Sequence, residues 1–322
     1  MNAIWIAWEE HRRTKELCIY FNVKLFILES ELPRIIKYPV LIYKTIKILT
    51  INKPKILFVQ NPSIVLAILC CYIKHFFKFK LVTDLHNAAI VPESSIQKIL
   101  LFVYKKVFNL SDINIVTNSN LLNRVITNNV KIVLPDKLPD INSTRGMIIS
   151  HNKKYFVSIC TFGIDEPYCE VIEAARLIGD SYLYVTGNIT KCPKKILKNL
   201  PENVVLTGFL PETEYIALLS SAEGIIDLTN REDCLVCGAY EAVSLEKPLI
   251  LSNTQALKSY FRRGVVFCDN DRISIKNAMQ DLQKNREVYE QEVKILKNEL
   301  ANEWEQLALK LKECLCTITD KI

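Results

Sequence analysis

Short apolar runs recur along the whole chain, and stretches with apolar residues at helical spacing lie between most of them. A strand that is buried on both faces has such a continuous apolar run. In the first half the predicted strands are Ala3–Ala7, Val23–Leu28, Ile56–Val59, Lys80–Thr83, Asp112–Val116 and Val130–Leu134. In the second half they are Tyr155–Cys160, Tyr182–Val185, Asn203–Leu206, Gly224–Leu228, Leu249–Leu251 and Val265–Cys268. Strands that alternate with helices predict an α/β fold with parallel sheets.

The helical pattern and the polar breaks predict two domains. The predicted helices include Arg12–Phe21, Ser94–Phe108, Pro167–Ile178, Glu212–Ser220, Thr254–Phe261 and a long stretch from Ser274 to Leu315. A polar segment from Pro135 to Lys154 interrupts the alternation, and we place the domain boundary there. We expect a Rossmann-like domain over residues 1–148, a second over 149–300, and a C-terminal helix over 301–322 that packs back on the first domain. Strand ends from both lobes would then face a deep interdomain cleft.

The stretch from Thr229 to Thr254 carries the strongest chemical signal. An apolar strand ends at Leu228, a polar turn follows, and a helix begins at Gly238-Ala239 with Glu241 in its first turn. Ligands of open α/β sheets bind at the carboxyl ends of strands, and a helix start suits a phosphate. A carboxylate one turn further on can accept hydrogen bonds from a ribose. The stretch therefore indicates a nucleotide-diphosphate site, although a lone first-turn Glu also stabilises a helix dipole.

Glycine is absent from residues 1–145. A glycine-rich phosphate loop, either the dinucleotide fingerprint or the Walker loop, is therefore excluded from the first half. Phosphate binding is expected in the second half.

Cysteine use favours a reducing compartment. The eleven cysteines include an adjacent pair, Cys70-Cys71, and others lie in apolar runs without the spacing of a disulfide framework. Cys234 and Cys237 form a CxxC that lacks two further zinc ligands nearby, which leaves a redox pair or small residues that line a turn. The N-terminal sequence lacks the features of a signal peptide. We expect a cytoplasmic protein.

Positive charge is concentrated in the first half. Residues 1–140 contain 19 Lys and Arg against 10 Asp and Glu, whereas the whole chain has a net charge of +6. Arg34, Lys37, Lys44 and Lys47 alternate with apolar residues in a basic amphipathic segment. Such a segment can lie on an anionic membrane surface, and it can equally be the solvated face of an ordinary helix. Nucleic acid is not expected as a partner, because no recognised binding module is present.

Several motifs resemble those of the nucleotide-sugar glycosyltransferases with the GT-B fold, in the family-4-like group. Asp233 and Glu241 have the spacing of the acidic pair of that group, and Gly238-Ala239-Tyr240-Glu241-Ala242 matches its helix start. Lys247–Ser252, Val265–Asn270 and Thr207–Leu210 are similar to its later elements. The pattern from Leu228 to Ala242 resembles bacterial cell-surface polysaccharide glycosyltransferases most. In the first half, Trp8–Arg13 and Asp84–Asn87 are similar to elements of those enzymes, and the latter also occurs in a eukaryotic dolichol-linked β-mannosyltransferase.

Two departures from the family pattern bear on the mechanism. Asp233 stands where a Glu is usual, with Glu232 one residue out of register. The Arg and Lys that retaining members place after the first C-terminal strand are absent from residues 158–170. We therefore expect an inverting transfer. No Asp-x-Asp suited to a metal is found, since Asp269-Asn270-Asp271 is better explained as a turn or helix cap. Neither a metal nor a cofactor is expected.

The resemblance assigns candidate residues to both halves. The candidate donor ligands are Thr161, Phe162, Gly187, Asn188, Phe209, Thr229, Arg231, Asp233, Cys237, Gly238, Ala239 and Glu241. Within that set the N–H groups of residues 237–239 and Arg231 are expected to hold the diphosphate, and Asp233 either contacts the donor sugar or caps the loop. The candidate bases for the acceptor hydroxyl are Asp84, Glu9, His86 and His11. A strand-end Asp such as Asp84 can instead cap the next helix.

The resemblance implies transfer of a sugar from a UDP- or GDP-sugar to a glycan acceptor. The basic first half favours a lipid-linked acceptor and a peripheral position on the inner face of the membrane. Two alternatives remain open. A nucleotide-sugar epimerase of the same fold would need no acceptor, and a non-catalytic partner subunit would keep the fold without the reaction.

Overall fold

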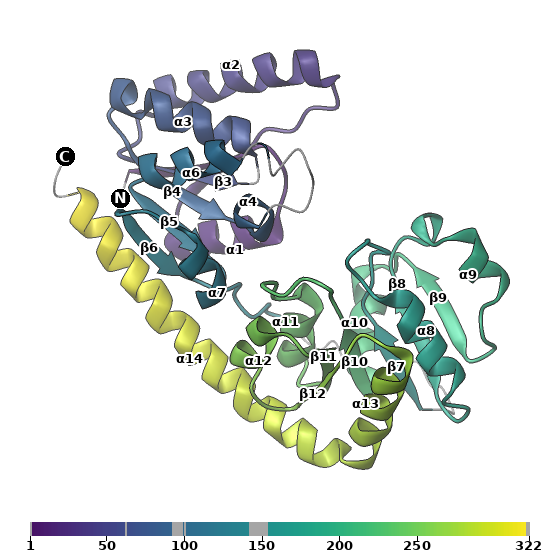
Figure 1. The fold of residues 1–322 in the computed structure, drawn as a ribbon. Helices are drawn as coiled ribbons and strands as arrows, with labels where there is room; N and C mark the ends of the chain where they lie inside the picture. The colour runs from purple at the N-terminus through teal and green to yellow at the C-terminus, as the bar shows by residue number, and fades with distance from the viewer. Residues whose placement is uncertain (1, 62, 92–98, 100, 142–153, 320–322) are drawn as a thin grey trace. The chain divides into compact units, whose positions relative to one another are not determined.

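The computed structural model describes residues 2–61, 63–91, 99, 101–141 and 154–319 (Figure 1). The chain divides into two compact units, which we treat separately. Unit 1 comprises residues 1–137 and 303–322, and unit 2 comprises residues 138–302. The last helix, α14 (Arg286–Thr319), contributes to both.

Unit 1 is built on a six-stranded parallel sheet with the order β2-β1-β3-β4-β5-β6. Its strands are β1 (Ala3–Ala7), β2 (Lys24–Ile27), β3 (Ile56–Asn61), β4 (Lys80–Leu85), β5 (Ile113–Val116) and β6 (Val130–Val133). The order reverses between β1 and β3, which are hydrogen-bonded neighbours. Such a reversal is a switch point, where the loops that follow the two strands diverge and leave room for a ligand.

Helices cover both faces of this sheet. They are α1 (Arg12–Phe21), α2 (Arg34–Asn52), α3 (Ile64–Phe77), α4 (Asn87–Ile90), α6 (Leu101–Leu110) and α7 (Ser119–Arg124). Trp5 and Phe58 stack at 4.9 Å on the face covered by α1 and by the residues of α14 from Trp304 onward. The opposite face packs against α2, α3 and Val107 of α6 (Figure 1). The alternation of side chains along the strands thus separates two apolar layers.

Three helices of unit 1 end in a left-handed residue that is not glycine. These C-caps are Asn22, Lys53 and Lys78, with φ values of 51°, 41° and 55°. Glycine would adopt this conformation without the cost of roughly 1–2 kcal/mol that a side chain incurs. The absence of glycine from residues 1–145 therefore carries a small energetic cost at each cap.

Unit 2 has a second six-stranded parallel sheet, with the order β12-β11-β10-β7-β8-β9. Its strands are β7 (Tyr155–Ser158), β8 (Tyr182–Thr186), β9 (Val204–Gly208), β10 (Gly224–Asp227), β11 (Leu249–Ser252) and β12 (Val265–Cys268). Its helices are α8 (Tyr168–Arg176), the 3-10 turn η1 (Ile189–Lys191), α9 (Lys194–Lys198), α10 (Glu212–Ser221), α11 (Cys237–Ser244), α12 (Gln255–Tyr260) and α13 (Arg272–Lys284). This is the strand order of a dinucleotide-binding Rossmann domain, with its switch point between β7 and β10.

The predicted α/β class with two parallel sheets is confirmed. Every predicted strand is present within two residues of its expected bounds. The helical stretch predicted from Ser274 to Leu315 is two helices, because α13 ends at a C-cap, Asn285, before α14 begins. Helix α9 was not predicted from the sequence, and the start of the predicted helix at Ser94 lies outside the described residues. Within the described residues, no helix combines the length and the apolar character needed to cross a bilayer.

Candidate functional site

The loop after β7 in unit 2 is folded around the side chain of Glu166. Its carboxylate accepts hydrogen bonds from the N–H groups of Thr161 and Gly163 and from the Thr161 hydroxyl, each at 2.8 Å. Phe162, between them, is left-handed with φ 58° and has its ring packed edge-on against Tyr168. Successive N–H groups that converge on one point form an anion-binding concavity. Here that concavity holds a carboxylate of the chain itself.

A second internal carboxylate stands at the start of α11. Asp227, the last residue of β10, is only 8% exposed and accepts hydrogen bonds from the N–H groups of Gly238 and Ala239. Glycine at position 238 allows this close approach, because a Cβ there would lie 2.6 Å from Asp227 Oδ2 and 2.5 Å from Ile159 Cδ1 and would displace those side chains. Two of the three N–H groups predicted to hold a diphosphate are thus engaged by Asp227.

The pKa of the Asp227 carboxyl group is raised well above that of an ordinary aspartate. Burial raises its pKa, and the negative charges of Glu166 and Glu241 raise it further. The hydrogen bonds from Gly238 and Ala239 act in the opposite direction, and the resulting pKa is about 8. Burial and like charges outweigh the helix N-terminus at this position.

Arg231 and Thr229 are anchored to the loop after β7. The Arg231 guanidinium lies 3.1 Å from Asp165, and the Thr229 hydroxyl donates to the same carboxylate at 3.3 Å. The N–H of Thr229 donates to Ser252 at the end of β11 at 2.9 Å. The Arg231–Asp165 pair is a third to a quarter exposed, so its strength is limited by solvent and it can exchange for another anion.

Glu241 is oriented by a residue that the sequence did not indicate. The Tyr215 hydroxyl on α10 donates a 2.6 Å hydrogen bond to the Glu241 carboxylate. Glu241 is half-buried, and it is the fifth residue of α11. The sequence placed it in the first turn, but α11 begins at Cys237 and its first turn contains no acidic residue. Of the two candidates for the other acidic position, Asp233 is buried, whereas Glu232 accepts a hydrogen bond from the N–H of Gln255 at the start of α12.

The remaining predicted donor residues follow β8 and β9. Gly187 has φ 108°, and a Cβ there would lie 2.0 Å from the carbonyl oxygen of Cys160, so the close approach of the two loops requires glycine. The Asn188 side chain accepts from the N–H of Thr190 and caps η1. Phe209 is exposed. The predicted set therefore gathers along the carboxyl edge of one sheet, at the ends of β7, β8, β9 and β10.

Unit 1 carries a buried ion network at its own carboxyl edge. Arg13 on α1 is 2% exposed and binds Asp84 at the end of β4 through Nε and Nη2, at 3.0 and 2.9 Å. Its Nη1 binds Asp136 at 2.7 Å. Burial alone would raise the pKa of Asp84, but Arg13 and His86 outweigh it and hold that pKa well below its usual range. Asp84 is therefore a permanently charged partner of Arg13.

The two histidine candidates lie beside this network. His86 Nε2 is 3.2 Å from Asp84 Oδ2, and its side chain is 17% exposed. The ring of His11 packs edge-on against that of His86 at 4.7 Å. Burial lowers the pKa of His11, and the neighbouring His86 lowers it further. Glu9 is exposed in the loop between β1 and α1. The structure thus joins Asp84, His86 and His11 in one cluster.

Several buried polar side-chain atoms at this edge have no hydrogen-bond partner among the described residues. They include Nδ1 of the largely buried His11, Oε1 of Gln60, and both amide atoms of Asn61 at the end of β3. Gln60 is the register neighbour of Asp84 on β3, and it is 5% exposed. Unsatisfied polar atoms of this kind are costly unless something binds them.

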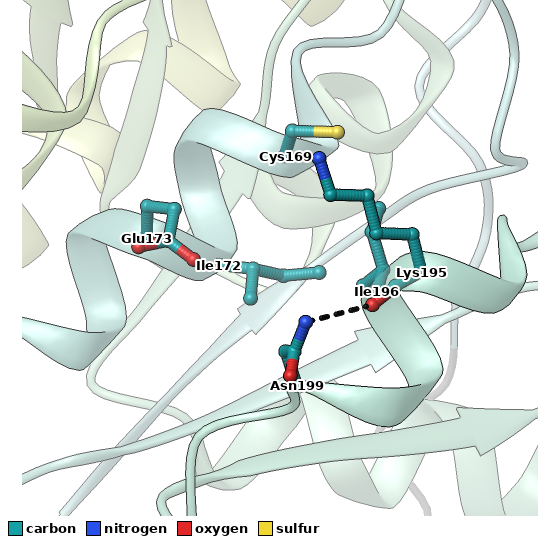
Figure 2. A pocket seen from close by; sticks show the side chains of 6 residues that line it. All are labelled: Cys169, Ile172, Glu173, Lys195, Ile196 and Asn199. Carbon is teal, nitrogen blue, oxygen red and sulfur yellow. Dashed lines mark hydrogen bonds between the residues drawn. The ribbon is translucent and has the colours of Figure 1, made fainter.

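Unit 2 also contains a cavity of about 250 Å³. It is lined by Cys169, Ile172 and Glu173 of α8 and by Lys195, Ile196 and Asn199 at α9 (Figure 2). None of the predicted site residues lines it. None of the eleven cysteines, all of which lie within the described residues, forms a disulfide, and Cys234 and Cys237 are not bonded to each other. The described residues contain no group of three or more His, Cys, Asp and Glu side chains placed to hold a metal ion.

Comparison with solved structures identifies the fold. The chain is similar to a sucrose-phosphate synthase from Thermosynechococcus elongatus, with 14% identity and a TM-score of 0.75 over 98% of this chain and 86% of that one. It is also similar to Anabaena HepE in complex with UDP and glucose, with 11% identity and a TM-score of 0.77 over 97% and 99%. A putative UDP-N-acetylglucosamine 2-epimerase from Listeria monocytogenes matches with 11% identity and a TM-score of 0.60 over 91% of each chain.

No known family profile matches the sequence, and no curated protein matches it. The structural likenesses extend over nearly the whole chain. They confirm the predicted GT-B fold.

Proposed function

We propose that the protein is a glycosyltransferase that moves a sugar from a nucleotide-diphosphate sugar to a glycan acceptor. The observation that carries the proposal is the position of Glu241 in a GT-B fold. It stands one turn into α11, the helix after β10 at the switch point of unit 2, with its carboxylate fixed by Tyr215. A fixed carboxylate at such a point can accept hydrogen bonds from two neighbouring ribose hydroxyls.

Arg231 is the group we place on the donor diphosphate. The N–H groups of Gly238 and Ala239 already bind Asp227, so a diphosphate reaches them only by competing with that carboxylate. Arg231 is held by Asp165 in a partly exposed pair, which a diphosphate with two negative charges can replace. Positive charge at this point also stabilises the diphosphate as it leaves, without a metal.

His86 is the base we favour for the acceptor hydroxyl. Asp84 is locked to Arg13 and almost fully buried, so it cannot reach an acceptor. It can accept a hydrogen bond from His86 Nε2, which leaves Nδ1 with the lone pair that takes a proton. The acceptor oxygen then forms its bond to the anomeric carbon as the bond to the diphosphate breaks, which inverts the configuration. His11 beside it is the second choice.

The nucleotide and the acceptor are finer proposals. HepE was solved with UDP and glucose, which favours a UDP-sugar over a GDP-sugar for this chain. We propose a lipid-linked glycan of cell-surface polysaccharide synthesis as the acceptor, at the inner face of the membrane. The excess of Lys and Arg in residues 1–140 supports that choice, because anionic lipids attract such a surface.

A donor screen by titration calorimetry tests the proposal. UDP, GDP and their sugars are titrated into the wild type, Glu241→Ala and Tyr215→Phe. We expect Glu241→Ala to weaken nucleotide binding about 10–100-fold, since it removes hydrogen bonds to a charged acceptor. Tyr215→Phe should have a smaller effect. Glu214→Ala, one residue from Tyr215 and exposed, is the control. Unchanged affinity in Glu241→Ala would remove the ribose assignment.

A nucleotide-sugar epimerase is the second candidate function. The likeness to a putative 2-epimerase over 91% of the chain supports it. An epimerase converts its nucleotide-sugar without an acceptor. Incubation of the protein with the donor that binds, followed by chromatography, separates the two. A new nucleotide-sugar formed in the absence of any acceptor would favour the epimerase.

A further inference from the structure

The three helices on one face of the unit 1 sheet carry positive charge and no acidic residue. These helices, α2, α3 and α6, form what we call the outer layer, which covers the face opposite to α1 (Figure 1). Their sequences contain no Asp or Glu. The exposed basic residues are Arg34, Lys44 and Lys47 on α2 and Lys105 and Lys106 on α6, with Lys37 half-buried, whereas Lys74 on α3 is largely buried and paired with Asp112. Helix α1 on the other face carries Glu16, and α8 and α10 of unit 2 begin with acidic first turns.

Helix α2 also presents an apolar strip to solvent. Ile35 is 89% exposed, and Ile36, Tyr43 and Ile46 are exposed with it. The opposite side of α2 packs against the sheet, where Leu41, Thr45 and Leu49 are buried. Residues 35, 39, 43 and 46 follow one another at helical spacing, so they share one face. Lys47 lies one turn beyond Tyr43, and Lys44 lies on the same flank of the strip.

The neighbouring helices of the outer layer add aromatic side chains. Phe76 and Tyr72 on α3 and Phe102 on α6 are more than half exposed. An ordinary solvated helix face carries polar residues, so a strip of exposed Ile, Tyr and Phe needs a covering surface. A nucleic acid would not explain the exposed isoleucines, because they form no favourable contact with its phosphate backbone. In a membrane, aromatic and aliphatic side chains enter the boundary between lipid headgroups and acyl chains.

We propose that the outer layer docks on an anionic lipid bilayer, with the exposed strip of α2 inserted at the headgroup boundary and its lysines on the lipid phosphates. The charge of the layer carries the choice of occupant. Two copies of this chain joined through the same face would place positive charge against positive charge, which disfavours a symmetric dimer. An anionic bilayer offers both the negative charge and the apolar interior. The inference needs no nucleotide, so it stands or falls separately from the proposed transfer reaction.

Flotation with vesicles tests this docking. The full chain is mixed with phosphatidylcholine vesicles that either contain or lack phosphatidylglycerol. We expect the protein to float with the anionic vesicles only, and less at high salt. A lysine near the surface is worth a factor of about five in partition, so Lys44→Glu with Lys47→Glu should reduce binding by more than about 20-fold. The matched control is Lys194→Glu with Lys198→Glu on exposed α9, which makes the same change in net charge.

A fluorescent reporter fixes which face makes the contact. The three tryptophans, Trp5, Trp8 and Trp304, are all buried, so Tyr43→Trp adds a single exposed indole on α2. Its emission should shift to the blue when anionic vesicles are added, and Ile35→Ser with Ile46→Ser should weaken binding without changing the circular dichroism. Absence of flotation, or equal losses in the α2 and α9 charge variants, would overturn the proposal. So would an unshifted reporter, or a dimer that the α2 variants dissociate while no vesicle binds.

Discussion

Asp84 and Asp227 occupy corresponding places in the two units, but the pKa of Asp84 is lowered and the pKa of Asp227 is raised. Each lies at or beside the carboxyl end of a central parallel strand, and both are buried. The guanidinium of Arg13 binds Asp84 with two nitrogens, and the pKa of that carboxyl lies well below its usual range. Asp227 has two backbone N–H groups and two carboxylate neighbours, and its pKa is raised to about 8.

The difference shows that burial does not by itself set the charge of a strand-end carboxylate. Burial favours the neutral acid at both positions. A full positive charge in direct contact overrides it, whereas the partial charges of a helix start do not. In unit 1 the fixed charge of Asp84 can position His86, and in unit 2 the raised pKa of Asp227 reduces the negative charge beside the proposed diphosphate site at neutral pH.

The largest effect is expected from substitution of His86, the proposed base, which Asp84 would orient. His86→Ala should lower kcat about 10²–10⁴-fold, because it removes the general base. Nucleotide affinity measured by calorimetry should stay within about twofold, since the proposed donor residues belong to unit 2. With a soluble acceptor analogue, His75→Ala on the exposed part of α3 serves as the matched control. A normal kcat in His86→Ala would move the base to His11 or Glu9.

Removal of Arg13 should break the charged state of Asp84. Arg13→Ala leaves a buried carboxylate without its partner, and we expect a loss of about 3–5 kcal/mol in the free energy of unfolding. Urea denaturation followed by circular dichroism measures it. The neighbouring Arg12 pairs with Glu16 at an exposed position, so Arg12→Ala should cost about 0.5 kcal/mol or less. Similar losses in both variants would contradict the buried network.

Asp227 should make the free energy of unfolding fall as the pH rises, which is opposite to the effect of a carboxyl with a lowered pKa such as Asp84. A carboxyl whose folded pKa is raised stabilises the fold fully below its unfolded pKa near 4, and that contribution is lost as the pH rises through about 8. Between pH 6 and 9 we expect the wild type to lose about 2–3 kcal/mol of stability at this group. In Asp227→Asn that loss should be absent from urea curves measured at each pH. A parallel decline in the two proteins would refute the raised pKa.

The smallest effect comes from the neighbours of Asp227. Glu166 raises the pKa of Asp227 more than Glu241 does. Glu166→Gln should therefore move the midpoint of the pH-dependent loss downward by about one pH unit, and Glu241→Gln by less. The same series of urea curves gives both midpoints. The reverse order would mean that Glu241 is the closer charge.

The local pattern of the sequence predicted the elements but not all their boundaries. All the strands follow from apolar runs, because a strand buried on both faces needs them wherever it lies in the sheet. The break at Asn285 was missed, since α13 and α14 have one continuous helical pattern. Of the donor residues, Gly238 was proposed from the sequence because it stands at a predicted helix start, whereas the contacts that favour glycine at positions 187 and 238 are visible only in the fold. Glu166 and Tyr215 gave no signal of their own.

The sequence by itself determined the strands of the described residues, the parallel α/β class and the absence of a glycine phosphate loop from residues 1–145, because these depend on residue types close together in the chain. Only the tertiary structure decided which charges meet. Arg13 is 71 residues from Asp84 and 123 from Asp136, and the order of strands brings them within hydrogen-bond distance. A Coulomb interaction depends on distance and burial, so the charge of Asp84 and the proton on Asp227 follow from the folded arrangement alone.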